Sequence, residues 1–113
     1  MTPEQMREFL DGHRHASKKI IALQMEIEAL ALTSDNDGEL QRLNNEISQC
    51  QGKMQAVRDA IRLLEDDNLE SVLLMRYINH LTVEETADAL SYARRTINEK
   101  IKKAVNKLCT IMP

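Results

Sequence analysis

The most constraining feature of this sequence is a spacing of residues that alternates between three and four along most of the first 65 positions. Such a spacing places every member on one side of an α-helix and is typical of a coiled coil. Two such runs are present, so the sequence predicts two long helices with one seam each. The seam residues of the first run are Met6, Phe9, His13, Ala16, Ile20, Leu23, Ile27 and Leu30, and those of the second are Leu40, Leu43, Ile47, Cys50, Met54, Val57, Ile61 and Leu64.

Turn-forming and helix-capping residues at positions 33–38 separate the two runs. A short polar connection between two long helices predicts an antiparallel hairpin, each arm spanning on the order of 40 Å at about 1.5 Å per residue. The register of such a hairpin sets Ile20 opposite Cys50 and Phe9 opposite Ile61. His13 is interpreted as a polar residue tolerated near the end of the seam, with a pH-sensitive role as the alternative.

A second apolar stripe on the first predicted helix lies away from the hairpin seam and consists of Ile21, Met25 and Leu32. A two-helix hairpin buries only one seam and is rarely stable by itself. We therefore expect this stripe to form a homodimer interface. The alternative is that the stripe packs against the C-terminal half of the same chain.

The C-terminal half, from residue 66 onward, predicts three shorter helices. The run Asp66, Asp67 and Asn68 offers a cap for the first, which carries an apolar face and stops at Asn79 and His80. Thr82 and Glu85 have the spacing of a capping box and predict the start of the second. The third begins at Arg94 after a turn of about three residues. The order of a short helix, a tight turn and a longer helix indicates a helix-turn-helix domain at 66–113, following a coiled-coil hairpin at 1–65.

Charge is distributed unevenly along the chain, whose net charge is -3. Residues 91–108 hold six basic and one acidic side chain, whereas residues 66–90 hold one basic and six acidic side chains. A local basic segment of this kind attracts phosphate, although a solvated helix face explains it equally well. The composition, with 3 Gly, 2 Pro and 3% aromatic residues, favours an all-α fold.

The third predicted helix has an outward face with side chains suited to reading DNA. Arginine suits guanine, asparagine suits adenine, and glutamate suits the amino group of cytosine in the major groove. The residues predicted to project outward are Arg94, Arg95, Asn98, Glu99 and Lys102. Those predicted to hold the phosphate backbone are Thr82, Lys103 and Lys107. Arg76 is a further candidate for phosphate, with an ion pair to Glu84 or Glu85 as the alternative.

The C-terminal residues also carry a resemblance to a known family. The runs VLLMRY at 72–77, LTVEETA at 81–87, LSYARRTI at 90–97 and KAVNKL at 103–108 resemble region four of bacterial sigma factors. With a long helical half in front, the chain resembles small phage-encoded proteins related to the RinA and ArpU late-transcription regulators. The resemblance implies promoter DNA binding. Two residues depart from the pattern, because Ser91 stands where the family often has Gly and Ala93 replaces the usual Ser or Thr cap.

These observations favour a cytoplasmic, DNA-binding transcription regulator of phage or prophage origin. Alternatives are a component of DNA packaging similar to a small terminase subunit, and an adaptor that contacts RNA polymerase or a sigma factor through the acidic second helix. No catalytic constellation, phosphate-binding Gly loop or metal-ligand spacing is visible, so we expect no enzyme activity, no cofactor and no metal. Cys50 and Cys109 are expected to be reduced thiols. No apolar run approaches the roughly 18 residues of a membrane span, and no signal peptide is expected.

Overall fold

The computed structural model of the chain describes residues 1–33 and 36–112, so Ser34 and Asp35 of the predicted connection lie outside the described residues. The described part contains helices and no strand, which confirms the all-α prediction. The elements are α1 (Pro3–Leu30), α2 (Asp37–Arg62), α3 (Asp67–Leu73), the π-helical turn η1 (Leu74–Ile78), α4 (Val83–Leu90) and α5 (Arg94–Ile111).

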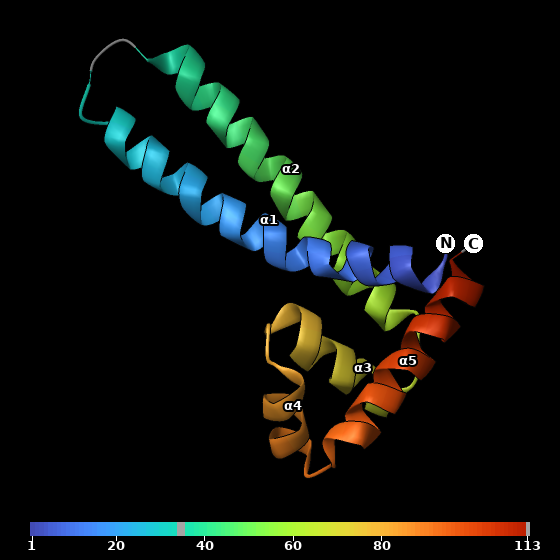
Figure 1. Cartoon of the computed structure of the whole chain (residues 1–113). Coiled ribbons are helices and arrows are strands. Elements are labelled where there is room, and N and C mark those ends of the chain that lie inside the picture. Colours follow the sequence, from blue (N-terminus) through green and yellow to red (C-terminus); the bar gives the residue numbers. More distant parts are fainter. Residues whose placement is uncertain (34–35, 113) are drawn as a thin grey trace.

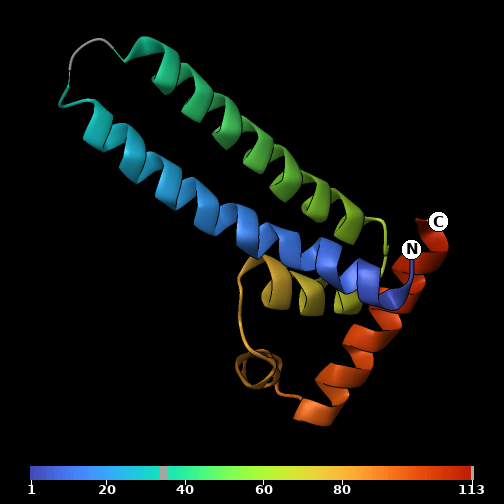
Figure 2. The ribbon, with the colours of Figure 1, turned by 45° about the horizontal axis from the view of Figure 1, so that its top comes forward.

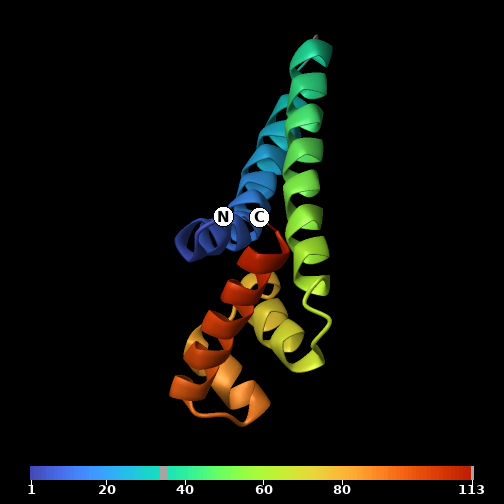
Figure 3. The same ribbon diagram turned by 90° about the vertical axis from the view of Figure 1, so that its right-hand side faces the viewer.

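The molecule is elongated, with principal extents of 55 × 32 × 21 Å. Helices α1 and α2 run side by side in opposite directions, and the shorter helices gather at the end where the chain begins (Figure 1). Viewed from the side, the tip of the long helices and the α4–α5 turn lie at opposite ends of the molecule (Figure 3). The α4–α5 turn is therefore far from the tip of the long helices.

Helix α1 begins three residues earlier than its apolar spacing indicates. Thr2 caps it, because its hydroxyl accepts a hydrogen bond from the Gln5 amide at 3.1 Å and the Gln5 side chain accepts one from the Thr2 amide at 2.9 Å. Pro3 follows at the first helical position, where its missing N–H costs nothing. These residues form a capping box that could have been read from the sequence.

Burial along α1 changes from one end to the other. Away from the C-terminal helices, the predicted seam residues Ile20, Ile27 and Leu30 are only half-buried, whereas Leu23 and Leu43 are buried between the two helices. Near its first turns α1 buries Leu10, which is not a member of the predicted seam. This difference arises because α1 contacts the C-terminal helices there as well as α2.

One continuous core joins the two halves of the chain. Met6 and Leu10 of α1 pack with the last turns of α2 and with buried residues of α3, η1, α4 and α5. Among the latter are Val72, Ile97, Ala104, Val105 and Leu108, which are all fully buried. The predicted domain division at residue 65 coincides with the connection between α2 and α3, but the core extends across it.

Caps predicted for the C-terminal helices are present. Asp66 accepts hydrogen bonds from the amides of Asn68 and Leu69, both at 3.1 Å, and that of Leu69 is the main cause of the lowered pKa of the Asp66 carboxyl. At α4 the Thr82 hydroxyl accepts from the Glu85 amide at 3.1 Å, and the Glu85 carboxylate accepts from the Thr82 amide at 3.0 Å. Both helices therefore start where local side-chain chemistry favours them.

The first C-terminal helix does not continue as a regular α-helix to Ile78, because the π-helical turn η1 follows α3. At its end the Leu81 amide donates to the carbonyl of Met75 at 2.9 Å. Arg76 donates from Nη1 to the carbonyl of Leu81 at 2.6 Å, and this replaces the ion pair to Glu84 or Glu85 considered from the sequence. Arg76 of η1 therefore holds the segment that leads into α4 by a hydrogen bond.

In the part of the chain that the structure describes, no helix is both long enough and apolar enough to cross a membrane.

Candidate nucleic-acid interface

The first turns of α5 form an exposed surface at the far end of the molecule from the tip of the two long helices (Figure 3). Helix α4 lies beside them, and the chain between the two helices turns sharply (Figures 1 and 2). The apolar residues of α5 face the core, as predicted. The side chains predicted to project outward are all exposed: Arg94, Arg95, Asn98, Glu99 and Lys102.

The turn between α4 and α5 is made by Ser91, which has φ 60° and ψ 41°. This left-handed conformation favours glycine, and a residue with a Cβ adopts it at a cost. Ala93 then takes the extended N-cap conformation without a side-chain hydrogen bond to the first amides of α5. Ser91 and Ala93, the two departures from the family pattern, therefore fall at positions where the backbone geometry favours a different residue.

We expect Ala93→Ser to stabilise the chain by about 1 kcal/mol, because a serine hydroxyl at the N-cap can accept from the unpaired amides of the first turn. Urea denaturation followed by circular dichroism measures this. The matched control is Ala89→Ser, the same change at an exposed position inside α4, where serine costs a few tenths of a kcal/mol. Equal effects of the two substitutions would contradict the expectation.

Each of the two arginines at the start of α5 is paired with a carboxylate. Arg94 Nη1 lies 2.9 Å from Glu84 Oε1 of α4, and Arg95 Nε lies 3.2 Å from Glu99 Oε1 one turn further along α5. All four side chains are exposed, so each pair contributes little to stability. The pairs orient the arginines but leave them able to exchange the carboxylate for another anion.

Some of the candidate phosphate contacts already make hydrogen bonds within the chain. Lys103 and Lys107 are both exposed, and Lys107 also donates from Nζ to the carbonyl of Leu64 at 2.6 Å. Both lysines contribute to the lowered pKa of Asp66, after the stronger effect of the amides that the carboxylate accepts. Thr82 is exposed while its hydroxyl caps α4. Lys107 and Arg76 thus already bind carbonyl groups of the chain.

A polar cluster that was not predicted from the sequence links the start of α3 to the α4–α5 turn by hydrogen bonds. Asn68 Nδ2 donates to the Tyr92 hydroxyl at 3.1 Å, and Lys100 Nζ donates to Asn68 Oδ1 at 2.5 Å. Lys100 Nζ also lies 5.0 Å from the centre of the Tyr92 ring. The three residues are widely separated in the chain, so no local sequence signal predicted the cluster. It holds the turn that precedes the exposed face of α5.

Of the predicted stripe, Ile21 and Met25 lie on α1, whereas Leu32 lies beyond the end of α1 at Leu30, so the prediction that all three share one helix is wrong for Leu32. All three side chains are exposed. The exposed fractions are 58% for Ile21, 65% for Met25 and 89% for Leu32. The alternative that this stripe packs against the C-terminal half of the same chain is therefore wrong, since that half contacts the opposite end of α1. None of the residues that the structure describes covers these three side chains.

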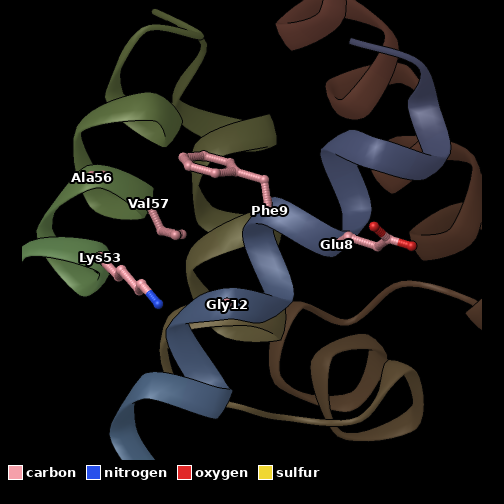
Figure 4. A pocket seen from close by; sticks show the side chains of 6 residues that line it. All are labelled: Glu8, Phe9, Gly12, Lys53, Ala56 and Val57. Carbon is pink, nitrogen blue, oxygen red and sulfur yellow. The ribbon is translucent and has the colours of Figure 1, made fainter. Parts of the chain in front are cut away.

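A small apolar notch lies between α1 and α2 near the base of the hairpin (Figure 4). It is lined by Glu8, Phe9, Gly12, Lys53, Ala56 and Val57. Phe9 and Val57 supply the apolar wall of the notch (Figure 4). The notch lies on α1 and α2, whereas the candidate interface lies on α5.

In residues 1–33 and 36–112 no group of three or more His, Cys, Asp or Glu side chains could hold a metal ion. Cys50 and Cys109 are free.

No protein-family model, curated protein or solved structure matches this chain.

Proposed function

We propose that this protein is a sequence-specific DNA-binding transcription regulator of the phage sigma-region-four-like class. In this proposal α4, its turn and α5 act as a helix-turn-helix, with the first two turns of α5 in the major groove. The observation that carries it is the outward face of α5, where Arg95, Asn98 and Glu99 are all exposed on the first two turns of the helix.

The chemistry of this face supports sequence reading more than simple attraction to phosphate. Arginine, asparagine and glutamate together match guanine, adenine and cytosine edges. Glu99 would repel a phosphate backbone, so its place beside Arg95 is unfavourable for a surface that only neutralises charge. Arg94 would read a base after exchanging Glu84 for DNA.

The first phosphate contacts proposed here are Lys102, Lys103 and Thr82, which are all exposed. Lys107 and Arg76 remain further candidates: each already donates one hydrogen bond to a carbonyl of the chain, but an ammonium group has three N–H donors and a guanidinium group five. Phosphate contacts set the position of a recognition helix and carry no sequence information themselves.

We propose that two copies associate through the stripe Ile21, Met25 and Leu32, with the long helices acting as a coiled-coil hairpin. An exposed apolar row on a helix with one covered face favours association with a second such helix. A dimer would also present two recognition surfaces to DNA, as many helix-turn-helix proteins do.

The purified chain is therefore expected to have the mass of a dimer in light scattering at roughly tens of micromolar. At such concentrations an interface with a micromolar dissociation constant is mostly occupied. Ile21→Lys combined with Met25→Lys should convert it to a monomer, because two buried ammonium groups would face apolar surface. Gln49→Lys combined with Gln51→Lys, at exposed positions on α2, is the control. A monomeric wild type, or a double variant that remains dimeric, contradicts this interface.

Selection of binding sites from random double-stranded DNA at two salt concentrations tests the proposed function. Sequence reading yields a motif that survives at the higher salt, whereas phosphate attraction yields salt-sensitive binding without a motif. Absence of any DNA binding would overturn the proposal. If the chain binds no DNA, capture of RNA polymerase through the acidic residues of α4 would favour the adaptor alternative. DNA binding by oligomeric assemblies of the chain alone would instead favour the DNA-packaging alternative.

A further inference from the structure

Two histidines that lie far apart in the sequence meet at the junction between α1 and the C-terminal helices. His13 Nδ1 of α1 lies 3.0 Å from Nε2 of His80, which stands between η1 and α4. The ring centroids are 5.1 Å apart and the ring planes are inclined at 57°. Helix α1 contacts η1 near this point (Figure 2). The pair therefore links the long hairpin to the segment that leads into α4.

The position of His80 is fixed by its surroundings. Its backbone has φ 59°, a left-handed conformation that a residue with a Cβ rarely adopts. The next residue, Leu81, is held by its amide to Met75 and by its carbonyl to Arg76. Strained backbone persists only where neighbouring contacts determine it. The His80 ring is thus presented to α1 by a segment that is tied down on both sides.

The hydrogen bond between the two rings requires that at least one of them is neutral. Between two neutral imidazoles, one nitrogen donates its N–H and the other accepts with its lone pair. When both rings are protonated, all four nitrogens are donors and the two facing nitrogens repel each other. His13 is 2% exposed, and its other nitrogen, Nε2, is buried without a hydrogen-bond partner. Protonating it would leave a buried charged donor unpaired, which is the costlier state.

The charged side chains that act on the pair are cations from two helices. Arg58 of α2 acts on His13, and Arg14 and Lys18 of α1 act on His80. Burial lowers the pKa of both histidines, and these cations lower it further. The same cations disfavour a metal ion between the two rings.

We propose that His13 and His80 form a proton-operated latch, which joins α1 to the η1–α4 connection when the pair is neutral and releases it when the pair is protonated. The latch does not depend on the proposed DNA binding. It would change how firmly the C-terminal helices are held to the hairpin.

The direction of the effect follows from linkage. Because the pKa of each histidine is lower in the folded chain than in the unfolded chain, the unfolded chain takes up protons first as the pH falls. The stabilisation is fully present above the unfolded value of about 6.5 and is lost as the pH falls through the folded pKa. Each pH unit within that window changes the equilibrium constant of unfolding by up to about tenfold for each histidine.

Two measurements test the latch. Proton NMR of the imidazole signals should show His13 and His80 titrating at lower pH in the folded chain than in urea. Urea denaturation at about pH 7.5 and about pH 5 spans the range in which histidine changes charge, and should give an equilibrium constant of unfolding that rises on acidification. Hydrogen exchange should accelerate in η1 and in the adjacent turns of α1 at the lower pH before it does so in α5.

Variants separate the pair from other titrating groups. His80→Asn keeps a residue that tolerates the left-handed backbone, and His13→Leu fills the buried position with an apolar side chain. Each should reduce the rise in the unfolding constant, while His15→Gln, at an exposed position of α1, should retain it. If either variant fails to fold, the NMR titration of the wild type still decides. The proposal is overturned if both histidines titrate as in urea, or if His80→Asn changes the rise by less than about twofold.

Discussion

Leu10→Ala is expected to destabilise the whole chain by about 2–5 kcal/mol, the usual cost of truncating a fully buried leucine. Leu10 has no exposed surface and packs in the core that α1 shares with the C-terminal helices. The substitution would leave a cavity at the junction of the two halves. Leu63→Ala is the control, because Leu63 is exposed at the end of α2, outside the proposed dimer interface, and its truncation should change the stability by less than about 0.5 kcal/mol.

Two probes would show whether the halves unfold together. Circular dichroism follows all helices, and tyrosine fluorescence reports on the C-terminal half, because Tyr77 lies in the shared core and Tyr92 in the α4–α5 turn. With one core, both probes should shift by the same amount in Leu10→Ala, since a cooperative unit has a single transition. A tyrosine transition that stays in place while only the helical signal shifts would contradict a shared core.

The second large effect is expected in DNA binding. Arg95→Ala and Asn98→Ala should each cost roughly 1–3 kcal/mol on the selected site and relax the preference at one base pair. Lys103→Ala should weaken binding to all sequences alike and reduce the salt slope by about one. These two patterns differ because base contacts carry sequence information and phosphate contacts do not.

Glu99→Ala gives the sharpest contrast. Removing this carboxylate takes a negative charge away from DNA and frees Arg95 from its partner at 3.2 Å, so nonspecific binding should strengthen while discrimination falls. Asn106→Ala is the matched control for Asn98→Ala, because Asn106 is exposed on the same helix three turns after Arg95. An unchanged motif in both Arg95→Ala and Glu99→Ala would show that α5 does not read sequence.

The sequence alone predicted features that depend on residues within one or two helical turns of each other. It predicted a cap for α3 among residues 66–68, the capping box of α4 at Thr82 and Glu85, and the start of α5 at Arg94. These interactions are local, so their spacing can be read directly. The exposure of the outward residues of α5 could be predicted for the same reason, because it follows from the position of the apolar residues around the helix.

Contacts between distant segments could be decided only by the tertiary structure. The burial of Leu10, the meeting of His13 with His80, and the bond from Lys107 to the carbonyl of Leu64 each depend on how α1 and α2 sit on the C-terminal helices. The apolar spacing of α1 indicates one seam, but its first turns face two partners at once. Apolar periodicity defines which side of a helix is buried and does not specify what buries it, since the hydrophobic effect is not directional.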